Sequence, residues 1–208
     1  MIRFHYFGIE GAPAPWQSIW EKQLQLHALV ASGQLGPQVI FAEHSSIYTA
    51  GRATQPAELP RDGSPVVQVN RGGRITWHGP GQLACYPIVK LTIGSVDYLR
   101  LLEQVIHRCL ADWGITSVSP PTLTGAWVPA TSRRPLRKIA FIGARVAQHT
   151  SLHGFALNVS NTLAPFANII PCGLEGVEVT SMAAELPYPP SVLRVAHTFE
   201  RHLEDVFC

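Results

Sequence analysis

The chain has 208 residues, of which 46% are hydrophobic and 14% are charged. This length fits one domain that buries its own core, so we expect residues 1–208 to form a single domain. The formal net charge of +2 is too small to indicate a nucleic-acid partner. No run approaches the roughly 18 apolar residues of a membrane span, and the N-terminus lacks a secretory signal pattern. We therefore expect a cytoplasmic protein that binds neither nucleic acid nor membrane.

The first half of the chain combines short apolar or aromatic segments with one helical pattern. We predict a strand over residues 2–8, followed by a helix in which Trp16, Ile19, Trp20, Leu24 and Ala28 fall at helical spacing. Gly33 ends that helix. Further strands are predicted over residues 39–41, 47–49, 66–69 and 83–89, with a proline-punctuated loop over residues 56–65.

The second half begins with a helix that Ser95 can cap and Gly114 closes. Two strands are predicted over residues 139–146 and 152–159, and a last helix is predicted from near Ser191. Strands outnumber helices and do not alternate with them regularly. This order favours an α+β or mixed α/β fold over a doubly wound sheet.

The four cysteines are widely spaced and contain no Cys-x-x-Cys pair, which argues against a zinc or redox motif. Cys85 and Cys109 lie in apolar strand and helix patterns typical of buried, inert thiols. Cys208 ends the chain. Cys172 differs from these three, because Pro171 and Gly173 surround it with a sharp turn that can present the sulfur.

A glycine-rich segment lies before the strand predicted at residues 83–89. It reads Arg71-Gly72-Gly73-Arg74-Ile75-Thr76-Trp77-His78-Gly79-Pro80-Gly81-Gln82. Its glycines let the backbone approach a ligand closely, and its spacing matches neither a Walker A loop nor a dinucleotide fingerprint. On pattern alone it is equally consistent with a glycine-rich hairpin.

Lys138 stands at the start of an apolar strand, Ile139-Ala140-Phe141-Ile142-Gly143. A lysine that is partly desolvated there can move protons, although most strand-end lysines simply reach water. A second polar and glycine-containing strand follows, His153-Gly154-Phe155-Ala156-Leu157-Asn158.

Together these segments resemble the octanoyltransferase family of lipoate biosynthesis. The family pattern Arg-Gly-Gly-x-x-Thr-x-His-x-x-Gly-Gln-x-x-x-Tyr matches Arg71 to Tyr86, and Lys-Ile-Ala-x-Ile-Gly matches Lys138 to Gly143. His-Gly-x-Ala-Leu-Asn matches His153 to Asn158, and Pro-Cys-Gly followed by Val-Thr-Ser matches Pro171 to Ser181. The chain departs from the family at Ser45-Ser46, where prolines are usual, and at Phe141, where alanine is usual. Because Phe141 is bulkier than alanine, we expect it to affect the length of the acyl chain that the enzyme prefers.

The resemblance implies a biotin/lipoate protein ligase-like mixed sheet and an acyltransferase without a cofactor or metal. It implies that Cys172 carries an octanoyl thioester and that Lys138 assists it. The donor is octanoyl-acyl carrier protein. The acceptors are lysines of the lipoyl domains of 2-oxoacid dehydrogenase E2 subunits and of the glycine cleavage H protein. The substrate-binding residues it implies are Arg71, Gly72, Gly73, Arg74, Ile75, Thr76, Trp77, His78, Phe141, Ile142, Gly143, Gly154, Phe155 and Ala156, with His153 as an accessory residue.

Several alternatives stay open at this point. An ATP-dependent lipoate ligase shares the glycine-rich loop and the lysine but needs no thiol at residue 172. A Cys–His thioesterase would use His78 or His153 as the base, and a non-catalytic acyl-binding protein would form no covalent adduct. The arginines 133, 134 and 137 are either a docking patch for an acidic carrier protein or a solvated loop.

Overall fold

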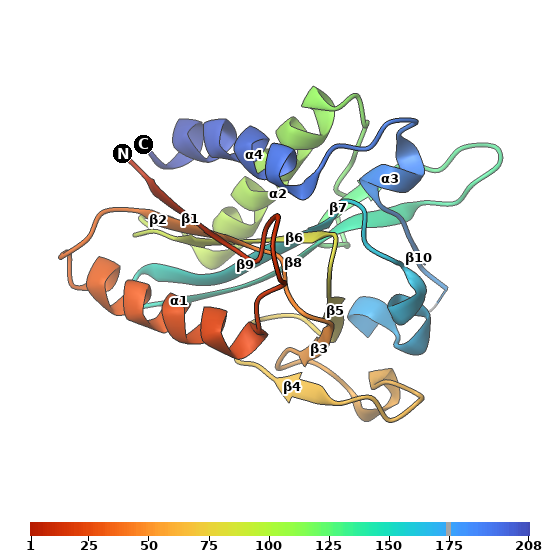
Figure 1. Cartoon of the computed structure of the whole chain (residues 1–208), viewed down its shortest axis with the longest axis horizontal. Coiled ribbons are helices and arrows are strands. Elements are labelled where there is room, and N and C mark those ends of the chain that lie inside the picture. The colour runs from red at the N-terminus through yellow and green to blue at the C-terminus, as the bar shows by residue number, and fades with distance from the viewer. Residues whose placement is uncertain (174–175) are drawn as a thin grey trace.

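The computed structural model describes residues 1–173 and 176–208 and contains a mixed sheet between layers of helix (Figure 1). Neighbouring strands follow the order β1-β2-β6-β9-β8-β10, and β7 also pairs with β8. The β1–β2 and β8–β10 pairs are parallel, and the other pairs are antiparallel. The strands are β1 (Arg3–Phe7), β2 (Gln38–Ala42), β6 (Gln82–Ile88), β7 (Ala126–Val128), β8 (Arg137–Ala147), β9 (Thr150–Asn158) and β10 (Glu178–Val179). The mixed α/β architecture expected from the sequence is confirmed.

Helices cover both faces of this sheet (Figure 1). On one face lie α2 (Ser95–Asp112) and α4 (Val192–Phe207), and on the other lies α1 (Trp16–Ala31). A short helix, α3 (Met182–Glu185), follows β10. Among the described residues, no helix combines the length and the apolar character that crossing a membrane requires.

A smaller sheet lies beside α1, below the main sheet in Figure 1. It has the order β4-β3-β5 and consists of β3 (Ile47–Ala50), β4 (Val66–Gln68) and β5 (Thr76–His78). Trp77 of β5 packs against Phe166, which in turn stacks on Phe141 of the main sheet with ring centroids 5.0 Å apart. This aromatic cluster fixes the small sheet against β8. Short 3-10 turns occur at Pro56–Glu58, Ala164–Asn168 and Pro171–Gly173.

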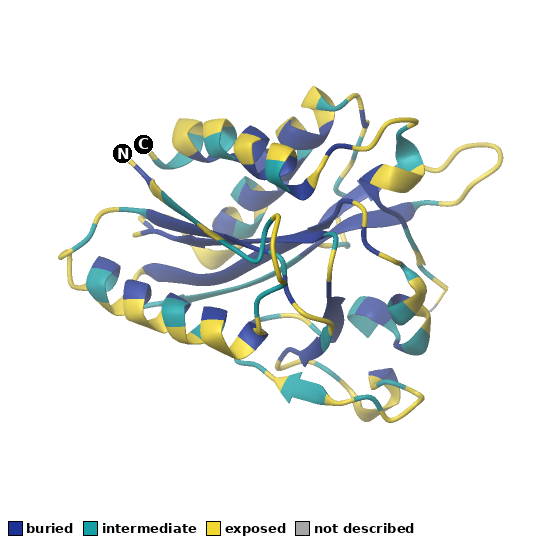
Figure 2. Ribbon diagram, in the orientation of Figure 1, coloured by how far each residue is buried: buried dark blue, intermediate teal, exposed yellow. Residues whose placement is uncertain are grey.

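The central strands are buried on both faces, as the dark ribbons in Figure 2 show. The sequences of β2 and β6 are accordingly almost continuously apolar rather than alternating, apart from the glutamine that begins each. One face packs on α2 and α4, and part of the other packs on α1. The rest of that second face, beside the small sheet, is left for the site described below.

The helix starting at Trp16 buries Trp16 and Ile19, as its spacing suggests, but the buried stripe shifts farther along the helix. Leu24 is 44% exposed and Ala28 is exposed, whereas Gln23 is fully buried. The Gln23 side-chain oxygen accepts a hydrogen bond from the His153 backbone N–H, 3.0 Å away. A buried polar contact therefore sets the rotation of α1, which apolar spacing alone cannot reveal.

Ser95 does not cap α2, so that prediction is wrong. The N-cap residue is Gly94, no side chain caps the helix, and Ser95 is its first helical residue. By contrast, the last helix does begin next to Ser191, as expected, and Ser191 caps α4: its side-chain oxygen accepts a hydrogen bond from the Arg194 backbone N–H.

Candidate active site

A bulge in β8 aims Lys138 at the face that carries the small sheet. Ala126 pairs with Ala140, but the next residue, Trp127, pairs with Lys138, so Ile139 is an extra residue on β8. Such a bulge changes which way the neighbouring side chains point. Ile139 and Ala140 consequently both pack in the core under α2 and α4, while Lys138 and Phe141 share the other face.

Cys172 sits on the sharp turn that the sequence predicts. Its backbone φ is 58°, a left-handed conformation that few residues other than glycine adopt, and Gly173 follows with φ 67°. The Cys172 backbone N–H donates to the Ile75 carbonyl, 3.3 Å away, and the Gly173 N–H donates to the Ile170 carbonyl, 3.0 Å away. A strained, half-buried cysteine held by its own backbone bonds is typical of a functional position.

The Lys138 ammonium contacts the Cys172 sulfur, with Nζ and Sγ 3.2 Å apart. The lysine is 2% exposed, and its Nζ lies 4.9 Å from the ring centre of Trp127 and 5.0 Å from that of Phe141. Aromatic faces attract a cation without neutralising it. Within residues 1–173 and 176–208, no carboxylate forms an ion pair with Lys138. The ammonium can therefore direct its charge to the sulfur.

A largely apolar cavity of about 310 Å³ opens beside this pair. Its floor includes Gly143 and Gly154, which lie directly opposite each other on β8 and β9 and so leave a stretch without side chains. Most of the residues expected at a substrate site line the cavity, namely Arg71, Gly72, Gly73, Arg74, Thr76, His78, Phe141, Ile142, Gly143, His153, Gly154, Phe155 and Ala156, together with Lys138 and Cys172. The segments that the sequence singled out thus meet around one cavity.

Arg71 lies buried over Gly143 at the edge of the cavity. Its Nη1 donates to the carbonyls of Gly72 and Arg74, and its Nη2 donates to the carbonyl and hydroxyl of Thr49. A Cβ on Gly143 would come within 2.7 Å of the arginine Cδ, so the glycine is needed for this close approach. Burial lowers the Arg71 pKa to about 10, which still leaves the guanidinium charged at neutral pH.

The comparisons with known proteins agree with this geometry. The model of the lipoyl protein ligase A/B catalytic domain matches residues 17–204. A protein of Salinispora tropica named octanoyltransferase is 45% identical over 190 residues, which cover 90% of this chain and 89% of the relative. A second octanoyltransferase, from Thermobifida fusca, is 43% identical and covers 99% and 89% of the two chains. The chain belongs to the octanoyltransferase family. It is therefore an enzyme of the acyltransferase class.

Solved structures share the fold at low sequence identity. A bipartite lipoate protein ligase from Thermoplasma acidophilum has a TM-score of 0.70 at 14% identity and covers 99% of this chain and 84% of its own. The biotin protein ligase of Aquifex aeolicus has a TM-score of 0.54 at 9% identity and covers 99% and 68%. The expected biotin/lipoate ligase-like fold is thus confirmed.

Two of the residues expected to bind substrate lie away from the cavity of this octanoyltransferase-family chain. Ile75 is fully buried in the aromatic cluster of the small sheet, although its carbonyl holds Cys172. The Trp77 ring packs on Phe166, and its indole N–H donates to the Ser46 hydroxyl. Both residues support the site rather than line it, because alternation along β5 turns only Thr76 and His78 toward the cavity.

The structure also adds lining residues that sequence reasoning missed. The cavity is completed by Trp16, Thr49, Ala53, Val69, Tyr86, Leu99, Thr122, Leu123, Thr124 and Ala144. Tyr86 ends the first family pattern, so its place in that pattern was a signal. The segment Thr122-Leu123-Thr124 belongs to an irregular connection with no periodicity, and only the fold brings it to the site.

The histidines suggested as alternative bases are engaged elsewhere. The His78 ring bonds to the Gln82 amide oxygen at 2.8 Å, and the His153 ring bonds to the Asn70 oxygen at 2.9 Å and stacks on Trp20. Burial lowers the pKa of each histidine to about 3, so both rings are neutral at physiological pH. Among the described residues, the Cys172 sulfur forms a hydrogen bond with Lys138 and none with a histidine.

These buried histidines predict acid sensitivity of the fold. Burial lowers the pKa of His44 to about 4 and that of His78 and His153 to about 3, whereas an unfolded histidine titrates near 6.5. The unfolded chain therefore takes up protons that the native chain does not. We expect the free energy of unfolding to fall by about 1–2 kcal/mol per histidine between pH 7.5 and pH 5.

Urea denaturation at the two pH values measures this loss. His44→Gln should reduce the pH dependence, and His197→Gln, at an exposed position, should leave it unchanged. Equal or greater stability at pH 5 than at pH 7.5 would contradict the assignment of neutral, buried imidazoles.

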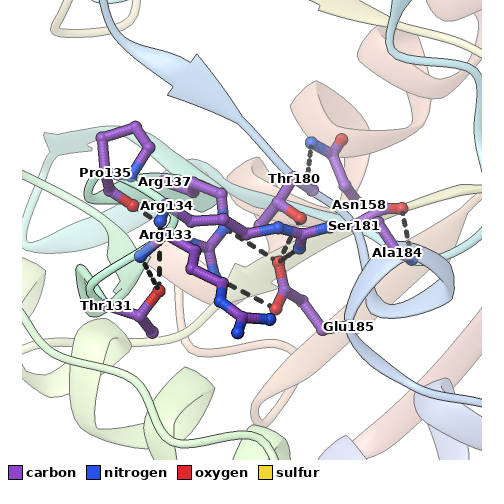
Figure 3. Close-up of polar contacts among 10 residues, drawn as sticks. All are labelled: Thr131, Arg133, Arg134, Pro135, Arg137, Asn158, Thr180, Ser181, Ala184 and Glu185. Carbon is purple, nitrogen blue, oxygen red and sulfur yellow. Dashed lines mark hydrogen bonds and ion pairs between the residues drawn. The ribbon is translucent and has the colours of Figure 1, made fainter.

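Arg137 cannot belong to a docking patch. Its side chain is 6% exposed and binds Glu185 through two nitrogens, Nε at 3.0 Å from Oε1 and Nη2 at 3.1 Å from Oε2 (Figure 3). Of the three arginines in the predicted basic cluster, Arg133 is exposed on the loop and Arg134 is 55% exposed. Adjacent residues of a strand face opposite sides, so Arg137 must point away from the cavity if Lys138 points into it.

Proposed function

We propose that this enzyme transfers an octanoyl group from acyl carrier protein to a lysine of a lipoyl domain through a thioester on Cys172. The observation that carries the proposal is the 3.2 Å contact between Lys138 Nζ and Cys172 Sγ at the edge of an apolar cavity. The acceptors are the lipoyl domains of 2-oxoacid dehydrogenase E2 subunits and the glycine cleavage H protein. Residues 1–208 act as one catalytic domain in the cytoplasm.

In the first half-reaction Cys172 attacks the carbonyl carbon of the octanoyl thioester. A free thiol is mostly protonated at neutral pH, and the thiolate is the nucleophile. A cation about 4 Å from an anion contributes up to roughly 4 kcal/mol at an effective dielectric constant near 20. The Lys138 ammonium therefore favours the thiolate. When the tetrahedral intermediate collapses, the bond to the phosphopantetheine sulfur breaks, and Lys138 can give that sulfur its proton.

In the second half-reaction the amine of the acceptor lysine attacks the octanoyl thioester on Cys172. The new C–N bond forms, and the C–S bond breaks to return the Cys172 sulfur. Lys138, neutral after the first step, takes the proton that the attacking amine loses. The pair thus starts and ends each cycle in the same protonation state.

The cavity lining supports an acyl chain as the bound group. Phe141 and Ala156 offer apolar surface on the face of the Lys138–Cys172 pair, and Ile142 and Phe155, which pack in the core under α2 and α4, complete the apolar lining. The Thr76 hydroxyl is buried without a partner among the described residues and can bond a carbonyl or amide of the substrate. Phe141 fills space that alanine would leave open, so it narrows the range of chain lengths.

The proposed transfer needs no nucleotide, because exchange between thioesters is nearly isoenergetic and the amide product is more stable. We expect octanoyl-carrier protein and a lipoyl domain to give octanoylated lipoyl domain at the same rate with and without ATP and magnesium. Mass spectrometry of the lipoyl domain measures the product. Transfer that requires added ATP and magnesium would instead favour an acyl-adenylate ligase, and release of free octanoate without acceptor would favour a thioesterase.

A further inference from the structure

The strand that carries the Lys138 amine is bordered at that residue by a very short pairing. Lys138 belongs to β8, and the segment after Cys172 returns to β8 as β10, where Glu178 pairs with Arg137 and Val179 with Lys138. One further backbone bond, from the Thr180 N–H to the Lys138 carbonyl at 2.8 Å, extends the contact. A pairing this short needs support to hold the backbone of Lys138 in place.

Side chains behind the site provide that support, as Figure 3 shows. The Thr180 hydroxyl donates to Glu185 Oε1, 2.6 Å away, and the same carboxylate binds Arg137 through two nitrogens at 3.0 and 3.1 Å. The Asn158 amide of β9 donates to the Thr180 carbonyl, 2.9 Å away. We refer to Arg137, Thr180 and Glu185 as the clamp.

The clamp is buried enough to be rigid. Thr180 is 2% exposed, and the side chains of Arg137 and Glu185 are 6% and 13% exposed. A guanidinium that binds a carboxylate through two parallel bonds fixes both orientation and distance. Burial raises the Glu185 pKa, but the hydrogen bonds from Arg137 and Thr180, together with the charges of Arg137 and Arg134, outweigh burial and hold that pKa below its usual range. The carboxylate thus stays charged at neutral pH.

None of the three clamp residues lines the cavity, yet Arg137 and Thr180 are joined directly to Lys138, and Glu185 joins these two residues to each other. Arg137 precedes Lys138 on β8 and points to the opposite face. The Thr180 backbone N–H donates to the Lys138 carbonyl. Fixing Arg137 to Thr180 through Glu185 therefore fixes the backbone from which Lys138 projects, while the turn of Cys172 is held by its own bonds to Ile75 and Ile170.

We propose that Arg137, Thr180 and Glu185 are positioning residues that hold the Lys138 amine against the Cys172 sulfur. The proposal rests on the proposed function, in which that sulfur is the nucleophile. A displacement of about 1 Å between reacting groups can cost up to a hundredfold in rate. Loss of the clamp should therefore slow the formation of the acyl-enzyme while leaving the affinity for the acyl donor unchanged.

Thr180→Val tests this directly, because it keeps the side-chain volume and removes the hydroxyl donor. We expect the maximal rate of acylation by octanoyl-carrier protein to fall about tenfold or more with little change in KM. Thr180→Ser restores the hydroxyl and should recover most of the rate. Glu185→Gln, which removes the charge that Arg137 binds, should show the same split between kcat and KM.

Alkylation with iodoacetamide at pH 7, followed by peptide mapping, measures the reactivity of each thiol. A general loss of stability would not slow the alkylation of Cys172. Cys172 should react more slowly in Thr180→Val, while the exposed Cys208 of the same molecule should react at an unchanged rate. Asp112→Asn is the matched control, because it breaks the ion pairs of Asp112 with Arg201 and His202 on α4, away from the site. This variant should acylate normally.

If Thr180→Val and Glu185→Gln both show wild-type rates of acylation and of Cys172 alkylation, the proposal that the clamp positions Lys138 is wrong. Loss of rate that Thr180→Ser fails to recover would also overturn it. The proposed function fails separately, if Cys172→Ala still forms the acyl-enzyme. If Cys172→Ala is inactive and Thr180→Val has normal activity, Cys172 is still the nucleophile and only the proposed role of the clamp is wrong.

Discussion

Replacing Cys172 with alanine is expected to reduce octanoyl transfer to a lipoyl domain by a factor on the order of 10⁴ or more. The substitution removes the atom that forms the covalent intermediate, and the other cavity residues cannot replace it. The cavity itself should survive, because the turn is held by backbone bonds to Ile75 and Ile170 rather than by the sulfur. The measurement is the steady-state rate of lipoyl-domain octanoylation.

Cys208→Ala is the matched control for this prediction. Cys208 is an exposed free thiol at the end of α4, so its removal should leave the rate unchanged. Cys85 and Cys109 are both fully buried in the core, where burial raises the pKa of each thiol far above neutrality. Comparable activity in Cys172→Ala and in the wild type would remove the thioester from the mechanism.

Lys138→Met should have the second largest effect, a loss on the order of 10³-fold in the rate of acylation. Methionine keeps the length of the side chain between Trp127 and Phe141 but removes both the positive charge and the exchangeable proton. We expect Lys138→Arg to react slowly, because it restores the charge but cannot release a proton at neutral pH. Rapid-quench kinetics with octanoyl-carrier protein measures the acylation rate of each variant.

Lys90→Met provides the comparison, since Lys90 is exposed and outside the cavity. It should acylate at the wild-type rate. Full activity of Lys138→Arg would show that charge alone suffices and would exclude proton transfer by the lysine. Full activity of Lys138→Met would exclude both roles of the lysine, the positive charge and the proton transfer.

The sequence predicted the participants of the site better than it predicted their arrangement. Cys172 stood out because proline and glycine flank it, and the structure confirms the left-handed turn at this residue. The family resemblance implied that Lys138 assists Cys172, and Nζ and Sγ lie 3.2 Å apart, but residue spacing alone does not show the contact that joins them. It depends on the extra residue Ile139 in β8, which turns the lysine toward the cavity, and a bulge of this kind leaves no mark in an apolar run.

Other failures of prediction have the same origin in long-range contacts. The partner of Arg137 is Glu185 on α3, and nothing local to the basic loop signals that ion pair. The face of α1 is set by Gln23, whose partner His153 lies on β9. Ile75 and Trp77 belong to the matched glycine-rich pattern, yet they pack in the aromatic cluster of the small sheet. A family pattern does not distinguish residues that contact a ligand from residues that support the ligand-contacting ones.

The most direct test of the account is to locate the acyl group on the enzyme. The wild-type protein is mixed with octanoyl-carrier protein in the absence of acceptor, and intact mass and peptide mapping are recorded. We predict one octanoyl group on Cys172, which disappears when a lipoyl domain is added and reappears on its lysine. Rapid transfer to the lipoyl domain without any adduct on Cys172, or with the adduct on another residue, would contradict the account.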